Sequence, residues 1–161
     1  METTGGIGSA GAAAATDRAD GLYAGMHRVF VFGTLKQGFP LHRQGLGDTP
    51  KRLDCRTVER FPMFIAGPWY APMMMNEPGY GLQVRGELYE VDDARLALLD
   101  GLESVGKPGN FRVVIEVEAL DGSARWLTFA YVKSRVFATP IYSDLLDVYN
   151  DDRFVPFDRR P

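Results

Sequence analysis

The sequence has a single cysteine, Cys55, and only two histidines, His27 and His42, among its 161 residues. One cysteine excludes an intramolecular disulfide and a cysteine-rich metal site. The histidines lie fifteen positions apart with no carboxylate pair nearby, so a zinc hydrolase site would lack ligands. We therefore expect no bound metal, and the scarcity of cysteine is typical of a cytoplasmic protein.

Neither a dominant charge nor a long apolar run is present. Eighteen Lys and Arg residues against 21 Asp and Glu residues leave a net charge of -3, which provides no basic field for nucleic acid. No apolar stretch approaches the ~20 residues that cross a bilayer. The N-terminus lacks the basic and apolar regions of a signal peptide. We expect no nucleic-acid partner, no membrane partner and a cytoplasmic location.

Familiar catalytic patterns are missing as well. No serine stands in a G-x-S-x-G pattern, and Phe39 replaces the lysine that a phosphate-binding loop would need after Gly33 and Gly38. Cys55 lies in a short apolar segment with no histidine close in sequence, so we interpret it as a packed thiol. These absences argue against serine hydrolase, nucleotide phosphate and cysteine nucleophile chemistry.

The composition, with 45% hydrophobic residues, predicts one globular domain with its own core. Residues 1–25 differ because they are rich in Gly, Ala, Thr and Ser, with almost no bulky apolar side chain before Leu22. Such a segment cannot bury enough surface to offset the entropy of ordering it. We predict a flexible extension over 1–25 and a single domain over 26–161. The sequence does not specify the oligomeric state, and a monomer is favoured.

Strand patterns dominate the domain. Two of them, joined through Asp121-Gly122, are predicted to form an antiparallel hairpin, because Asp-Gly is a strong turn signal. Shorter apolar pieces are interrupted by prolines, which indicates edges and bends. The strands are predicted over 28–32, 84–91, 111–117 and 126–132, and the short pieces over 53–58, 63–66 and 72–75.

Helical patterns are few. Asp92 is a suitable N-cap for the segment DDARLALLDGLE, in which leucines at three-residue spacing give one apolar stripe. A second, short helix is predicted over 143–150, followed by an irregular tail. Because regular βαβ alternation is absent, we predict an α+β domain with a small, strongly bent mixed sheet or partial barrel.

Two features offer candidate chemistry. The loop over 33–38 leaves a strand at Gly33, where glycine lets backbone N–H groups approach an anionic ligand; the alternative is a turn kept for its geometry alone. Glu103 ends the predicted helix, where the helix dipole raises the pKa of a carboxyl group and so suits a general base near neutral pH. The alternative for Glu103 is a solvated surface side chain.

Other polar and apolar residues have weaker interpretations. Asp100 is a rival acid near Glu103. Glu87 is interpreted as structural, either paired inward with Arg85 or Arg112 or facing water. The run Met73 to Met75 indicates an apolar strand rather than the lining of a pocket. Three aromatic residues are interpreted as covering a sheet edge rather than lining a wide pocket mouth, namely Trp69, Tyr70 and Tyr80.

Taken together, the motifs resemble the gamma-glutamylcyclotransferase-like superfamily, and in particular its gamma-glutamylamine cyclotransferase (AIG2-like) branch. The resemblance extends from about residue 29 to 132 and implies a small mixed β-barrel with few flanking helices, without metal or cofactor. The motifs that carry it are VFVFGTLKQGFPLH, FPMFIAGP, VRGELYEVD and LLDGLE followed by NFRV.

The resemblance also implies an activity. Members convert a gamma-glutamyl-amine, such as gamma-glutamyl-lysine, or a gamma-glutamyl amino acid to 5-oxoproline and a free amine, with Glu103 here as the acid/base. Phe32 and Phe111 stand where the family usually has tyrosine, which leaves open a non-catalytic binding or regulatory module that keeps the pocket. The leaving amine, including a tagged biosynthetic intermediate, is not specified. The implied substrate-binding residues are Phe32, Gly33, Thr34, Leu35, Lys36 and Gly38.

Overall fold

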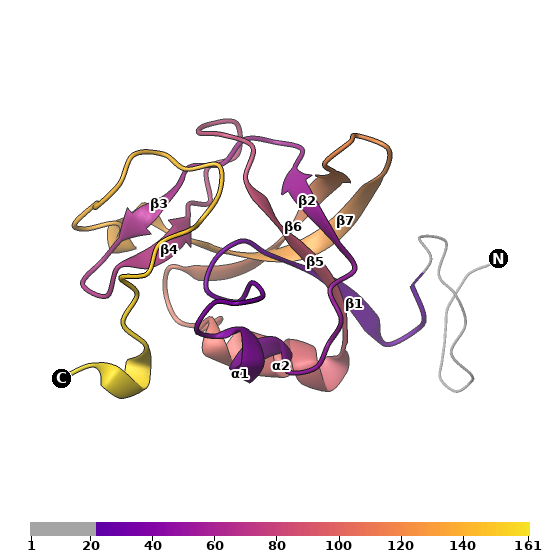
Figure 1. Cartoon of the computed structure of the whole chain (residues 1–161), viewed down its shortest axis with the longest axis horizontal. Helices are drawn as coiled ribbons and strands as arrows, with labels where there is room; N and C mark the ends of the chain where they lie inside the picture. The colour runs from indigo at the N-terminus through magenta and orange to yellow at the C-terminus, as the bar shows by residue number, and fades with distance from the viewer. Residues whose placement is uncertain (1–21) are drawn as a thin grey trace.

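The computed structural model describes residues 22–161, in which a curled sheet is flanked by two α-helices (Figure 1). Of the extension predicted over 1–25, residues 1–21 lie outside this range, while Leu22 is buried, so the division into extension and domain stays a prediction. The elements are β1 (Met26–Val31), α1 (His42–Leu46), β2 (Leu53–Thr57), β3 (Met63–Ala66), β4 (Ala71–Met74), β5 (Arg85–Asp92), α2 (Asp93–Leu102), β6 (Asn110–Ala119) and β7 (Arg125–Lys133), followed by 3-10 turns at Arg135–Phe137 and Phe157–Arg159.

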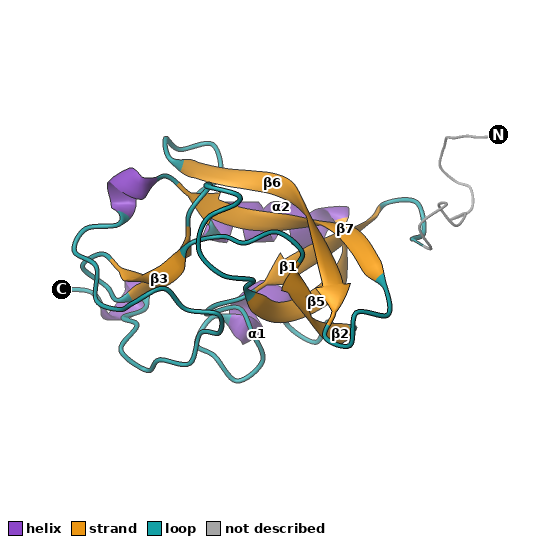
Figure 2. Cartoon of the chain, turned by 90° about the horizontal axis from the view of Figure 1, so that it is seen from above, coloured by secondary structure: helices purple, strands orange, loops and turns teal. Residues whose placement is uncertain are grey.

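Five strands close into a barrel in the order β1-β5-β2-β6-β7. All neighbours are antiparallel except β1 and β7, which run parallel and pair at Val29 and Phe129. The β6–β7 hairpin is the longest pair and turns at Gly122, whose φ of 75° suits glycine. Figure 2 shows the strands crossing as the sheet curls. This architecture confirms the predicted α+β barrel.

A second, two-stranded sheet of β3 and β4 lies beside the barrel. The short helix predicted over 143–150 is wrong, because this segment instead runs extended along β3 (Figure 1). The Tyr142 N–H donates to the Ile65 carbonyl at 2.8 Å, and the Leu146 N–H donates to the Met63 carbonyl at 2.7 Å. The unpaired edge of β3 thus provides hydrogen bonds that override the weak helical pattern.

Helix α1 was not expected from the sequence. It has five residues, no side-chain hydrogen bond at its N-cap, and a glycine, Gly45, within it. Its position is explained by tertiary packing, since a Cβ atom on Gly45 would collide with Leu35 and contact Leu99. The glycine therefore lets α1 lie close against α2 and the preceding loop.

Alternate residues on the strands contribute to two buried clusters. On β5, Leu88 belongs to the barrel interior, whereas Tyr89 and Val91 belong to the cluster between the barrel and the helices. Cys55 is fully buried in the barrel interior, and burial raises the pKa of its thiol to about 12. Of the two interpretations, a packed or a half-exposed thiol, the structure confirms the packed one.

The C-terminal segment contributes to the barrel core through Tyr149, which is fully buried and packs on the Phe39 ring at a centroid distance of 5.3 Å. We expect Tyr149→Ala to lower the free energy of unfolding by about 3–5 kcal/mol, as for other buried aromatic truncations. Urea denaturation followed by circular dichroism measures this loss. The matched control is Phe157→Ala, since Phe157 is 85% exposed; equal losses in the two variants would contradict the role of Tyr149.

Candidate active site

The loop after β1 and the end of α2 lie at one end of the barrel. Because β1 and β7 are parallel, their carboxyl ends meet, and the loop that begins at Gly33 leaves β1 beside the end of β7 at Lys133. A Cβ atom on Gly45 of α1 would contact Leu35 of this loop and Leu102, the last residue of α2. Glu103 directly follows Leu102, so the backbone of the candidate base lies on the same side of the barrel as the loop.

The loop is a sequence of tight turns. The Lys36 N–H donates to the Gly33 carbonyl at 3.1 Å, and the Leu41 N–H donates to the Thr34 carbonyl at 2.9 Å. Within residues 22–161, the backbone N–H groups of Thr34 and Leu35 have no hydrogen-bond acceptor. These two donors are available to an anionic group of a ligand.

Steric crowding by Pro72 explains why residue 33 is a glycine. A Cβ atom there would lie 2.6 Å from Cγ of Pro72 on β4, well inside van der Waals contact. The close approach that the sequence indicated at Gly33 is therefore made by Pro72. At Gly38, by contrast, φ is 83° and the space is open, so glycine there is needed for the turn itself.

The side chain of Lys36 is held by contacts with the rest of the fold. Its Nζ donates to the Tyr149 carbonyl at 2.8 Å and lies 4.7 Å from the centre of the Phe39 ring. Burial lowers the pKa of Lys36, while the carboxylates of Glu87 and Asp54 oppose that shift. Lys36 thus ties the loop to the C-terminal segment. Phe32, the first residue of the predicted site, is partly buried against the barrel core.

Glu103 forms the C-cap of α2, and its N–H donates to the Leu99 carbonyl at 2.9 Å. Ser104 follows in the left-handed region, with φ of 57°. Hydrogen bonds from the Ser104 N–H to the Gly101 carbonyl and from the Val105 N–H to the Asp100 carbonyl complete a Schellman motif. This turn ends the helix and fixes the backbone on which the Glu103 side chain stands.

The Glu103 carboxyl group is only partly exposed and has no hydrogen-bond partner within residues 22–161. Burial raises its pKa, and the positive charge of Lys133 opposes the shift. The direction agrees with the expectation from the sequence, but the main cause is desolvation rather than the helix dipole. A carboxylate of raised pKa is a stronger base near neutral pH.

Asp100, the rival acid, has both oxygens occupied. Oδ1 accepts a hydrogen bond from the Tyr131 hydroxyl at 2.8 Å, and Oδ2 accepts one from Arg112 Nη1 at 2.6 Å. The Arg112 guanidinium also lies over the Phe129 ring, 4.4 Å from its centre. Asp100 therefore anchors α2 to the β6–β7 hairpin, and Glu103 is the unengaged carboxylate of the pair.

Of the two alternatives for Glu87, the carboxylate is buried and paired rather than facing water, but its partners are not the arginines considered from the sequence. Its Oε1 accepts hydrogen bonds from the Gln37 N–H and the Tyr89 hydroxyl, both at 2.9 Å, and not from Arg85 or Arg112. The physical reason is that Arg112 is committed to Asp100, while Arg85 is exposed. A backbone N–H partner has no signature in the sequence, so this hydrogen bond was not predictable.

The other candidates are part of the packing. Met73, Met74 and Met75 are buried, as expected of an apolar strand. Trp69 lies under Arg160, at 4.9 Å from the ring centre, and Tyr70 packs on Tyr142 at 4.4 Å. Both rings serve as cover. Tyr80 does not, since it is 70% exposed, and Phe111 is 41% exposed.

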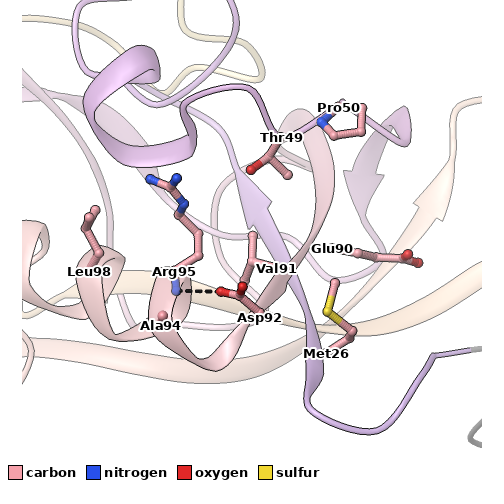
Figure 3. A pocket seen from close by; sticks show the side chains of 9 residues that line it. All are labelled: Met26, Thr49, Pro50, Glu90, Val91, Asp92, Ala94, Arg95 and Leu98. Atoms are coloured by element: carbon pink, nitrogen blue, oxygen red, sulfur yellow. Dashed lines mark hydrogen bonds between the residues drawn. The ribbon is translucent and has the colours of Figure 1, made fainter. Parts of the chain in front are cut away.

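A separate hollow of about 440 Å³ lies at the opposite end of α2 (Figure 3). It includes the N-cap, where the Asp92 carboxylate accepts a hydrogen bond from the Arg95 N–H at 2.8 Å, as predicted for Asp92. None of the predicted site residues lines it. The lining residues are Met26, Thr49, Pro50, Glu90, Val91, Asp92, Ala94, Arg95 and Leu98.

Within residues 22–161, no three His, Cys, Asp or Glu side chains gather closely enough to hold a metal ion. No helix there has the length and apolar character required to span a bilayer.

A family model described as gamma-glutamyl cyclotransferase, AIG2-like, matches residues 29–147. The chain belongs to this family. It is 36% identical over 123 residues to a gamma-glutamylaminecyclotransferase of Rattus norvegicus, covering 73% of this chain and 81% of that one. It is 40% identical over 104 residues to the Homo sapiens protein of the same name, covering 62% and 67%.

The fold of the family is shared as well. A crystal structure of an AIG2-like protein from Mus musculus superposes with a TM-score of 0.73 at 30% identity, covering 84% of this chain and 99% of that one. The likeness to AIG2-like proteins that the sequence motifs indicated is therefore confirmed, over a longer range than the motifs themselves.

Ser104 occupies the position of a Schellman motif at which glycine is usual. Glycine is preferred there because the left-handed conformation is strained for residues that carry a side chain. We expect Ser104→Gly to raise the free energy of unfolding by about 1 kcal/mol. Urea denaturation provides the measurement. The reciprocal control is Gly122→Ser, at a φ of 75° in open space, which should lose a similar amount; a destabilised Ser104→Gly protein would argue against the Schellman geometry.

The raised pKa of Glu103 predicts a pH-dependent effect on stability. A carboxyl whose pKa is higher in the folded state binds its proton more tightly there, so its ionisation at neutral pH costs stability. We expect Glu103→Gln to be more stable than the wild type at pH 7, with the difference vanishing below about pH 4. Denaturation curves at the two pH values measure it. A Glu103→Gln protein that is less stable at pH 7 would show that the carboxylate is favourably paired.

Proposed function

We propose that this chain is a cyclotransferase that converts a gamma-glutamyl-amine, such as gamma-glutamyl-lysine, or a gamma-glutamyl amino acid to 5-oxoproline and a free amine. The observation that carries the proposal is the partly buried, unengaged carboxylate of Glu103 at the same end of the barrel as the unpaired N–H groups of Thr34 and Leu35. The names of the rat and human relatives support an amine as the leaving group.

The nucleophile in this reaction belongs to the substrate. Its α-amine attacks its own γ-carbonyl carbon and closes a five-membered ring, so no nucleophile from the protein is needed. The task of the site is to hold the gamma-glutamyl chain folded, with the amine within reach of the carbonyl. Neither a redox change nor a cofactor enters the balance, since one C–N bond forms as another breaks.

Glu103 moves the proton. The substrate α-ammonium loses a proton to the Glu103 carboxylate, which frees the lone pair for attack. After the tetrahedral intermediate has formed, the protonated Glu103 gives this proton to the departing nitrogen, so that a neutral amine leaves. The ring nitrogen loses its second proton to the regenerated Glu103 carboxylate, from which the proton passes to solvent or to the released amine. One carboxyl group of raised pKa serves both steps, because it accepts and releases a proton near neutral pH.

The turn after β1 holds the negative charges. The oxygen of the γ-carbonyl becomes an oxyanion in the intermediate, and the backbone N–H groups of Thr34 and Leu35 are donors that need no reorganisation. We assign the substrate α-carboxylate to the same loop. Backbone donors do not depend on side-chain identity, so phenylalanine at position 32 leaves them intact.

Glu103→Gln keeps the size of the side chain and removes its basicity. We expect it to form 5-oxoproline from gamma-glutamyl-lysine or gamma-glutamyl-alanine about 10²- to 10⁴-fold more slowly than the wild type, with little change in KM. Product is quantified by chromatography with mass detection. The matched control is Glu116→Gln, a partly exposed carboxylate on β6, which should retain full activity.

The same assay separates catalysis from binding alone. A non-catalytic module would bind a gamma-glutamyl compound without forming 5-oxoproline. Wild-type protein that releases no 5-oxoproline from any gamma-glutamyl compound would refute the proposed activity, whereas near-normal turnover by Glu103→Gln would refute the assigned base. The panel of gamma-glutamyl compounds also identifies the leaving amine.

A further inference from the structure

Glu87 is a buried carboxylate that the proposed reaction does not use. It stands on β5 between Val31 of β1 and Asp54 of β2, and only 9% of its surface is exposed. Burying an ionised carboxylate is costly unless hydrogen bonds replace the lost water. Its position beneath the substrate loop therefore calls for an explanation beyond packing.

We infer that Glu87 is a positioning residue that holds the loop after β1 in its ligand-binding conformation, through the backbone of Gln37. This inference rests on the proposed function, and it adds the residue that supports the substrate-binding loop. The Gln37 N–H donates to Oε1 of Glu87 at 2.9 Å. Since a charged acceptor strengthens a hydrogen bond, this contact fixes the loop three residues after Thr34.

The carboxylate is itself held in place by Tyr89. The fully buried Tyr89 hydroxyl donates to the same Oε1 at 2.9 Å. Burial, followed by the hydrogen bond to Glu87, raises the pKa of Tyr89, so the hydroxyl remains a donor throughout the physiological pH range. Glu87 and Tyr89 lie two residues apart on one strand face, and the hydroxyl therefore fixes where the carboxylate meets the loop.

A second side chain, His42, holds the backbone of the same loop at Leu35. His42 Nδ1 donates to the Leu35 carbonyl at 2.8 Å, because a carbonyl can only accept. The His42 ring packs against Tyr89 at a centroid distance of 5.9 Å. The two N–H groups assigned to the substrate are thus followed along the chain by two held backbone groups, the Leu35 carbonyl bound to His42 and the Gln37 N–H bound to Glu87.

The charge of Glu87 also acts on Lys36. The titratable groups that interact with this pair are Asp54, Cys55 and Tyr89, and the Glu87 carboxylate favours the charged form of the buried Lys36 ammonium. That ammonium holds the Tyr149 carbonyl of the C-terminal segment. Glu87 therefore supports the loop by a backbone hydrogen bond and by stabilising the cation next to it.

The test compares Glu87→Ala, Glu87→Gln and Tyr89→Phe by steady-state kinetics with gamma-glutamyl-lysine and by hydrogen exchange at the Gln37 amide. We expect Glu87→Ala to speed exchange at Gln37 at least about tenfold and to lower kcat/KM by roughly 10²-fold, since a displaced loop misplaces the substrate. Glu87→Gln retains an acceptor oxygen and should recover most of both losses. Tyr89→Phe should lie between the two.

The matched control is Glu90→Gln, on the same strand and facing Arg28 and Arg52, which should leave both measurements unchanged. Folded Glu87→Ala protein with wild-type exchange at Gln37 and wild-type kinetics would overturn the inference. If Glu87→Ala does not fold, Tyr89→Phe protein with wild-type exchange at Gln37 and wild-type kinetics would overturn it. If the wild type forms no 5-oxoproline, the proposed function fails, and exchange at Gln37 still decides the role of Glu87.

Discussion

The parallel contact between β1 and β7 determines where the candidate chemistry lies. Four of the five junctions in the barrel are antiparallel, and this fifth one closes it at Val29 and Phe129. Because both strands end at the same rim, the loop after β1 and the end of β7 at Lys133 meet there. Helix α2 is attached to the same rim through Asp100, Arg112 and Tyr131, which brings Glu103 to the loop.

Three carboxylates, Asp100, Glu87 and Glu103, differ in their hydrogen-bond partners and therefore in their roles. Asp100 is occupied by a guanidinium and a hydroxyl, and Glu87 by a backbone N–H and a hydroxyl, so each stabilises an element of the fold. Glu103 alone of the three has no hydrogen-bond partner within residues 22–161, and burial raises its pKa. A carboxyl group whose pKa is raised by burial, more than the Lys133 charge lowers it, is suited to moving a proton near neutral pH.

Elements that are specified by a short motif of neighbouring residues were predicted correctly from the sequence. The Asp121-Gly122 turn specifies the β6–β7 hairpin, and Asp92 caps α2, so both followed from the sequence. Helix α1 depends on packing around Gly45, and the segment over 143–150 is extended because it completes the edge of β3. Neither long-range cause has a local signature.

The candidate site was likewise only partly predictable from the sequence. Glu103 and the turn after Gly33 were identified from motifs, and the structure brings them to one rim. The partners of Glu87 and Lys36 were not, because the Gln37 N–H and the Tyr149 carbonyl are backbone groups that any residue carries. Side-chain motifs in a sequence do not specify which backbone groups a buried charge will meet.

The central claim is that Glu103 and the turn contact one ligand, and titration with 5-oxoproline followed by NMR tests it most directly. The account predicts that the Thr34 and Leu35 amide signals and the labelled Glu103 carboxyl signal shift together, with a single Kd. Shifts at only one of these two places would contradict it. So would shifts confined to Thr49 and Arg95, which line the hollow at the other end of α2.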